Sequence, residues 1–260
     1  TVLFSTLILV PYADVFNNNL NTNTFMEESI VFENDIRPDI YYIILDEYAG
    51  QKSLENYFKF KKDKFIEFLK LNGFHVMDNS NSNYMATNFA VPSIMNMEYV
   101  HQSKKNMGTT NSDSNILNAY QQNNVMNFLN QNDYKTINIY GGALEKIKIS
   151  DQNLCGDKAI VDFHTSLTQT TMFWVIQKYQ FINNINEIRF CAFHELEIVG
   201  ERNNKPIFVF AHIKLPHDPF TIGSNGETVI PKKIDFGISS DNNKVGYLNQ
   251  LEYANKMIME

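Results

Sequence analysis

The chain has 260 residues and is 43% hydrophobic, which is enough to bury the core of one large domain. Its formal net charge of -7 leaves no excess of Lys and Arg to neutralise phosphates, so we exclude a nucleic-acid-binding protein. The two cysteines, Cys155 and Cys191, are too few for a disulfide framework. They could form one bridge in an extracytoplasmic domain, or they could be two small buried residues.

The chain begins with an apolar run, TVLFSTLILV. It permits two interpretations: residues 1–11 are the end of a transmembrane helix, or the run is a buried strand. We favour the helix end, because Pro11 and a polar stretch follow it like a membrane exit. Residues 12–36 show no clear period and predict a linker. Residues 37–260 then form the domain.

The stretch RPDIYYIILDEYAG, residues 37–50, contains an uncharged run at 40–45 that ends in Asp46 and Glu47. Such a run predicts a strand buried on both faces, as in parallel sheets. Ligands of open α/β sheets bind beyond the carboxyl ends of the strands, where these carboxylates would lie. They could hold a metal ion or act as acid or base, or they could simply end the strand and cap the next helix.

Strands and helices are predicted to alternate along the rest of the chain. Helices are expected at 61–71, after Pro92, at 115–132, 165–181 and 247–260. Residues 53–60 are expected to form a loop or short helix, and residues 221–246 a long loop. Further strands are expected at 74–76, 135–140 and 205–212. This alternation predicts an α/β fold with a mostly parallel central sheet flanked by helices on both faces.

Thr87 lies just upstream of the helix expected after Pro92. A hydroxyl near a helix N-terminus lies in a positive potential that favours anions such as phosphate or sulfate. The alternative is a threonine that only caps the helix or stabilises a turn. His212 and His217 lie at and beyond the end of the strand at 205–212. Without further information, they would be a core histidine satisfied by backbone and a loop histidine between prolines.

Four segments, in this order and spacing, resemble the sulfatase-like branch of the alkaline phosphatase superfamily. That branch includes arylsulfatases, lipoteichoic acid synthase and phosphoethanolamine transferases. The segments are PDIYYIILDEY, SNYMATNFAVPSIMNMEYV, FVFAHIKLPHDPF and YLNQLEYANKMIME, and they cover roughly residues 38–260. They look like the family's first metal-binding strand, its nucleophile helix, its histidine-bearing strand and the helix before its last metal-binding strand.

The resemblance implies a role for each candidate residue. Asp46 would bind a divalent metal ion, with Glu47 as an extra ligand. Thr87 would be both nucleophile and metal ligand. His217 would bind substrate and assist catalysis, and His212 would be a second substrate-facing histidine. A metal ion would activate the Thr87 hydroxyl for covalent catalysis. The ion could be magnesium, manganese, calcium or zinc.

Two departures from the family pattern bear on the activity. Sulfatases use a cysteine in a C-x-P-x-R motif, whereas this chain has Thr87 at the cysteine position and Val91 at the arginine position. This difference favours phosphoryl transfer over classical sulfatase activity. The family's later Asp-His ligand pair is expected beyond Glu260. We therefore expect the chain as it stands to bind metal only weakly and to be inactive alone, as the truncated N-terminal part of the catalytic domain.

The predicted function is that of a membrane-anchored, extracytoplasmic hydrolase or transferase. Its substrate would be a small-molecule, lipid-linked or glycan ester of phosphate or sulfate. Two alternatives remain: a true sulfatase with an atypical nucleophile, and a non-catalytic surface domain that retains the fold.

Overall fold

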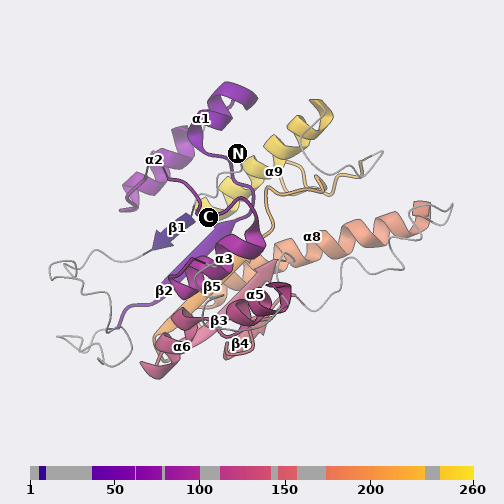
Figure 1. Ribbon diagram of the computed structural model, residues 1–260. Helices are drawn as coiled ribbons and strands as arrows, with labels where there is room; N and C mark the ends of the chain where they lie inside the picture. The colour runs from indigo at the N-terminus through magenta and orange to yellow at the C-terminus, as the bar shows by residue number, and fades with distance from the viewer. Residues whose placement is uncertain are drawn as a thin grey trace.

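The computed structural model describes residues 6–9, 37–61, 63–77, 80–99, 112–141, 146–156, 174–231 and 241–260. Within them, one sheet has the strand order β1-β2-β5-β3-β4 (Figure 1). Strands β2, β5, β3 and β4 run parallel, and β1 is antiparallel to β2. The bounds are β1 Thr6–Leu9, β2 Ile40–Leu45, β3 Lys135–Gly141, β4 Gln152–Leu154 and β5 Ile207–Ile213. The predicted α/β class is therefore confirmed.

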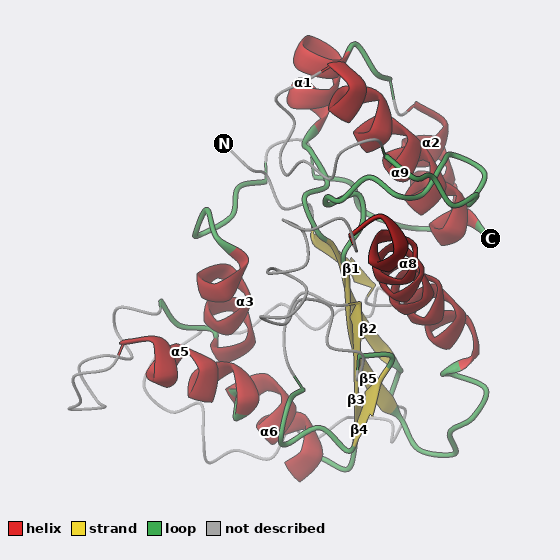
Figure 2. Cartoon of the chain, turned by 90° about the vertical axis from the view of Figure 1, so that its right-hand side faces the viewer, coloured by secondary structure: helices red, strands yellow, loops and turns green. Residues whose placement is uncertain are grey.

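Helices cover both faces of this sheet (Figure 2). Helices α3, α5 and α6 lie on one face and α8 lies on the other, with α1, α2 and α9 beyond the upper end of the strands. The bounds are α1 Gln51–Ser53, the π-helical turn η1 Leu54–Phe58, α2 Asp63–Leu71, α3 Thr87–Asn96, α5 Ser112–Gln121, α6 Asn124–Gln131, α8 Trp174–Ile198 and α9 Asp241–Met259.

The central strands are buried on both faces, as their apolar runs predict. Alternate side chains of β2 and β5 belong to two separate cores. Ile43 and Val209 pack with residues of α2, α8 and α9. Tyr42 and Phe210 stack on one another on the face covered by α3, α5 and α6. Asp39 accepts a hydrogen bond from the Ile207 amide (2.9 Å), which ties the beginnings of β2 and β5 together.

Several predicted elements differ in the structure. Residues 6–9 form strand β1, as the second interpretation of the N-terminal run has it; pairing there satisfies backbone groups on the outer edge of β2. The predicted linker at 12–36 lies outside the described residues. Residues 74–76 form no strand; they follow α2 as irregular chain, with Phe74 and Val76 packed against the core. Strand β4 was not predicted.

The helix predicted at 115–132 is divided into α5 and α6. The break occurs because the Asn123 side chain caps α6, accepting a hydrogen bond from the Met126 amide (2.9 Å). Helix α3 begins at Thr87 rather than after Pro92, which lies inside it. Helix α8 extends to Ile198, well beyond the predicted end, and residues 165–173 lie outside the described part. Helix α9 begins at Asp241 and shortens the expected loop.

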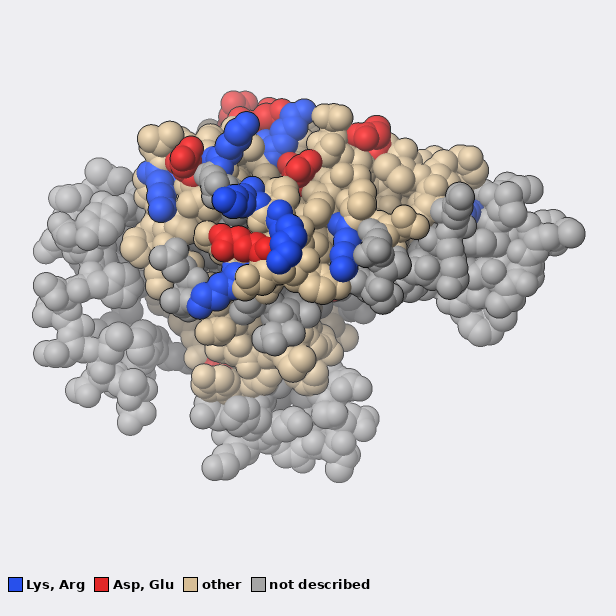
Figure 3. All heavy atoms as spheres, turned by 90° about the horizontal axis from the view of Figure 1, so that it is seen from above, with Lys and Arg blue, Asp and Glu red and all other residues tan. Residues whose placement is uncertain are grey.

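Cys155 and Cys191 form a disulfide, the first of the two alternatives that the sequence left open. The bridge joins the residue after β4 to helix α8, with 5.7 Å between the Cα atoms. Among the described helices, none is both long and apolar enough to cross a membrane. On the described surface seen from above, Lys and Arg side chains are interspersed with Asp and Glu (Figure 3), so that view shows no field of a single sign.

Candidate functional site

The carboxyl ends of β2 and β5 bring the predicted residues together. These strands are parallel neighbours, with Ile44 opposite His212, and the Asp46 amide continues the ladder by donating to the Ile213 carbonyl (2.9 Å). Asp46 and Glu47 therefore leave β2 beside the point where Lys214 and His217 leave β5. Thr87, at the start of α3, reaches the same edge. This is the edge of an α/β sheet at which ligands bind.

Asp46 lies between Thr87 and His212. The Thr87 hydroxyl donates to Asp46 Oδ1 at 3.4 Å, a long hydrogen bond, and His212 Nε2 lies 3.6 Å from Asp46 Oδ2. Asp46 is only 2% exposed. Burial raises the pKa of its carboxyl, but the imidazoles of His212 and His217 and the Lys214 ammonium lower that pKa further, so the net shift is downward. Asp46 is therefore an ionised, buried carboxylate.

The alternatives for Thr87 and His212 can be compared with this geometry. The N-cap of α3 is Ala86, and no side chain caps the helix, so Thr87 does not serve as its cap. Its hydroxyl bonds to Asp46 instead. His212 is fully buried, and neither of its ring nitrogens forms a hydrogen bond within the described residues. It is therefore not a core histidine satisfied by the backbone; its nearest charged neighbour is Asp46.

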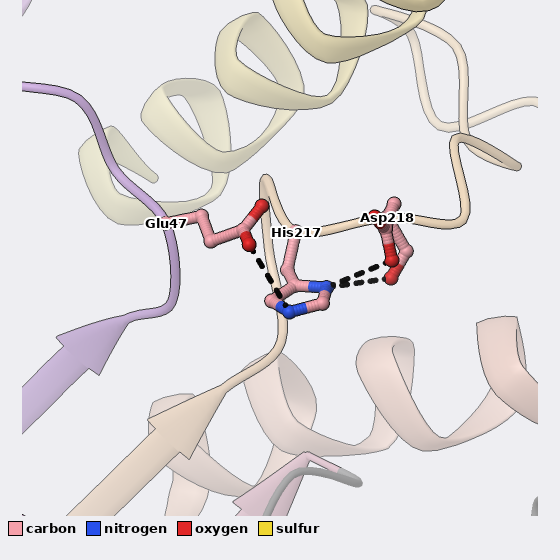
Figure 4. Close-up of side chains that lie close together, drawn as sticks. All are labelled: Glu47, His217 and Asp218. Carbon is pink, nitrogen blue, oxygen red and sulfur yellow. Dashed lines mark hydrogen bonds and ion pairs between the residues drawn. The ribbon is translucent and has the colours of Figure 1, made fainter. Parts of the chain in front are cut away.

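A second group joins Glu47, His217 and Asp218 (Figure 4). Glu47 Oε1 lies 3.3 Å from His217 Nε2, and Asp218 Oδ1 lies 3.2 Å from His217 Nδ1. The Asp218 carbonyl is also 2.8 Å from Nδ1. Glu47 has a left-handed backbone with φ of 62°, an uncommon conformation for a residue other than glycine. This turn directs the Glu47 side chain toward His217, whereas the Asp46 side chain continues the face of β2 that α3 covers.

The two carboxylates face both ring nitrogens of His217, and this governs its protonation. Burial lowers the pKa of His217, but the hydrogen bond with Asp218 and the charges of Asp46 and Glu47 raise it more, so the net shift is upward. Burial also raises the pKa of the Glu47 carboxyl, and the charges of Asp218 and Asp46 add to that rise. The group therefore favours a bound cation, either a proton on His217 or a metal ion.

Glu47, His217 and Asp218 could hold a metal ion. Each offers one ligand atom, and these atoms all lie within 4.8 Å of one another. Two carboxylate oxygens and an imidazole nitrogen suit zinc, manganese or iron better than calcium, which prefers oxygen ligands alone. Of these donors, Glu47 was expected as an extra ligand and His217 as a substrate-facing residue, whereas the resemblance implies Asp46 and Thr87 as the main ligands. Asp46 and Thr87 lie beside the group but outside it.

Two charged residues of the site were missed. Asp218 directly follows His217 in the segment PHDPF, and an acidic neighbour of a candidate histidine was a sufficient signal to include it. Lys214 follows β5 and is half-buried. Burial and the nearby Arg189 lower the pKa of its ammonium, while the carboxylates of Asp46 and Asp218 oppose that shift. Lys214 therefore lies among the charged groups at this edge of the sheet, with its pKa below the usual range for lysine.

Comparisons with protein-family models, with curated proteins and with solved structures found no match for this chain.

Proposed function

We propose that the protein is a metal-dependent hydrolase or transferase acting on phosphate or sulfate esters, with Thr87 as its nucleophile. The observation that carries this proposal is the contact between the Thr87 hydroxyl and the buried Asp46 carboxylate (3.4 Å), at the ligand-binding edge of a parallel sheet. A nucleophile beside a base, with further charged groups around it, is the arrangement that covalent catalysis needs.

The start of α3 favours an anionic group next to Thr87. Thr87 is the first residue of this ten-residue helix, so the helix dipole places positive potential at its hydroxyl. Lys214 lies nearby, and although burial lowers the pKa of its ammonium, the carboxylates of Asp46 and Glu47 favour the charged form. A phosphoryl or sulfuryl group carries its charge on peripheral oxygens, which these positive groups would stabilise.

A divalent metal ion fits the donors on this edge, with Glu47, His217 and Asp218 on one side and Asp46 and Thr87 on the other. When bound, it would polarise the ester and favour the ionised form of the threonine hydroxyl. We propose that the ion lies next to Asp46 and Thr87. It would be magnesium, manganese, calcium or zinc.

The residues of this edge can supply every proton transfer that the reaction needs. Thr87 Oγ1 attacks phosphorus, its proton passes to Asp46, and the bond from phosphorus to the leaving oxygen breaks. His217, whose pKa is raised, gives a proton to the leaving oxygen; in this step it acts as an imidazolium and not as a metal ligand, so Asp46, Thr87 and Glu47 would hold the ion. Water then attacks the phosphothreonine in a hydrolase, or a second alcohol attacks it in a transferase. The attacking group returns a proton to His217, and Thr87 recovers its own from Asp46.

The resemblance to sulfatase-like enzymes supports this reaction class, and the parallel sheet with helices on both faces is consistent with it. An extracytoplasmic, membrane-anchored location belongs to the same proposal. It is supported by the disulfide between Cys155 and Cys191, because such bridges persist mainly in oxidising compartments.

The test replaces Thr87 in the full-length protein with Ala, and with Ser as the matched control that keeps a hydroxyl. Each protein is assayed with nitrophenyl phosphate, a nitrophenyl phosphodiester and nitrophenyl sulfate as substrates. Each assay is run with magnesium, manganese, calcium and zinc in turn. We expect Thr87→Ala to lower kcat by more than about a thousandfold, as loss of a nucleophile does, and Thr87→Ser to retain part of the activity.

A mass increase of one phosphoryl or sulfuryl group on Thr87 after rapid quenching would identify the covalent intermediate. Activity that survives Thr87→Ala rejects Thr87 as nucleophile.

A further inference from the structure

The segment that carries His217 and Asp218 is held by a buried arginine of another element. Arg189 lies on α8 and is fully buried. Its Nη2 donates to the carbonyls of His217 (2.9 Å) and Asp218 (3.2 Å). Its Nη1 donates to the Pro219 carbonyl, the Thr221 hydroxyl and the Gln250 side-chain oxygen, each at 3.1 Å. One guanidinium therefore binds three successive carbonyls of this segment.

Gln250, on α9, completes the same network from the other side. Its Nε2 donates to the carbonyls of Pro216 (3.1 Å) and His217 (2.9 Å). Its Oε1 accepts from the amides of Thr221 (2.9 Å) and Ile222 (3.2 Å), as well as from Arg189. The side chain is fully buried, and each of its polar atoms is used at least twice. Arg189 and Gln250 together bind the backbone at every residue from 216 to 222 except Phe220.

The same face of α9 also holds the other half of the metal-binding group. Tyr247, one turn before Gln250, donates its hydroxyl to the Glu47 carbonyl (2.9 Å) and accepts from the Ala49 amide (2.9 Å). Tyr247 and Gln250 thus fix the backbones of Glu47 and His217 to one rigid helix. Because the hydrogen-bonded backbone atoms are those of the ligand residues themselves, the separation of Glu47 from His217 depends on this helix.

We propose that Arg189 and Gln250 are positioning residues, which hold the backbone of His217 and Asp218 so that their side chains and Glu47 converge on one cation. A role for these two residues in catalysis rests on the proposed function. Their effect on the orientation of the His217 ring does not depend on that function. The guanidinium suits the task because its planar array of donors spans several carbonyls, which the single ammonium of a lysine does not.

The test uses three variants of the full-length protein: Arg189→Lys, Gln250→Met and the control Ile188→Ala. Arg189→Lys keeps the charge, and Gln250→Met keeps the volume, but each removes hydrogen bonds to the segment. Ile188 is buried in α8 next to Arg189, and none of the hydrogen bonds described above involves its side chain. Its truncation leaves a cavity and lowers stability without removing one of these hydrogen bonds. Circular dichroism confirms that each variant is folded.

Two readouts follow the site itself. The first is the affinity for Mn²⁺ alone, measured by electron paramagnetic resonance; we expect it to fall about 10–100-fold in Arg189→Lys and Gln250→Met. The second is the rate at which diethyl pyrocarbonate modifies His217 in metal-free protein, relative to the exposed His194, determined by peptide mass spectrometry. We expect His217 to react severalfold faster in both variants, because its ring loses its bond to Asp218. Ile188→Ala should change neither readout.

Unchanged Mn²⁺ affinity and unchanged His217 reactivity in folded Arg189→Lys and Gln250→Met would overturn the inference. Equal changes in Ile188→Ala would also overturn it, since general destabilisation would then explain them. The proposed function fails separately, if the wild-type protein hydrolyses no ester or binds no metal. In that case the reactivity of His217 still decides whether Arg189 and Gln250 position it.

Discussion

His217 is the residue whose charge depends most directly on its surroundings. Glu47 and Asp218 face its two ring nitrogens at 3.3 Å and 3.2 Å. These contacts stabilise the imidazolium in the folded protein, and they do not exist in the unfolded chain. A histidine with a raised pKa contributes stability that is complete below the unfolded pKa of about 6.5 and is lost as pH rises through the folded pKa.

This linkage predicts how His217→Gln should behave in metal-free protein kept with a chelator. The free energy of unfolding that the substitution removes should be largest below about pH 6.5 and should shrink as pH rises through the folded pKa. Urea unfolding of both proteins between about pH 5 and about pH 9, on both sides of the unfolded pKa of about 6.5, measures this difference. His194→Gln, at an exposed position on α8 away from the Glu47 and Asp218 carboxylates, is the control for replacing a histidine with glutamine. A difference that grows with pH contradicts the assigned charge.

At the scale of one element, the break between α5 and α6 depends on Asn123. This buried side chain accepts from the Met126 amide (2.9 Å) and donates to the Tyr120 carbonyl (3.0 Å), so it ends one helix and begins the next. Helix α6 packs Met126 and Leu129 into the core beneath β2 and β5. The cap therefore fixes the angle at which this apolar face meets the sheet.

We expect Asn123→Ala to lower the free energy of unfolding by about 1–2 kcal/mol, since it removes an N-cap and leaves the Met126 amide unpaired. Asn127→Ala is the matched control, because Asn127 is exposed within α6 and alanine favours helix. It should change stability by less than about 0.5 kcal/mol. Chemical denaturation compares the two, and equal effects would show that Asn123 is not a specific cap.

At the scale of the whole molecule, the disulfide joins β4, an edge strand, to α8, which carries Arg189. Its two cysteines are 36 residues apart in sequence. A link over a loop of this length restricts the unfolded chain and stabilises the folded state by about 3–4 kcal/mol. The bridge also connects the edge of the sheet to the helix that holds the His217 segment.

Reduction should therefore lower the free energy of unfolding by about 3–4 kcal/mol. Urea unfolding with and without a reductant measures the change, and thiol titration of the denatured protein before reduction should find no free cysteine. The double variant Cys155→Ala and Cys191→Ala should be insensitive to the reductant. Free thiols in protein purified without reductant would contradict both the bridge and the oxidising compartment that it supports.

The sequence by itself determined the elements whose cause is local. The apolar runs within 40–45, 135–140 and 205–212 are strands because they are buried on both faces, and the amphipathic run at 61–71 is a helix because its apolar residues recur with helical spacing. It also indicated four residues at strand ends, the carboxylates Asp46 and Glu47 and the histidines His212 and His217, although a functional role for the histidines needed the family resemblance. Thr87 needed the family resemblance to be identified as a nucleophile.

Only the tertiary structure decided which of these residues meet. The pairing of β2 with β5 places Asp46 beside His212, and the turn at Glu47 and the position of Asp218 create the second group around His217. Arg189 and Gln250 carry no local signal, because a buried arginine or glutamine in a helix resembles an exposed one in sequence. The backbone carbonyls that they bind lie 28 to 34 residues away along the chain. Such contacts depend on how helices pack over loops. The periodicity of apolar residues in the sequence does not predict that packing.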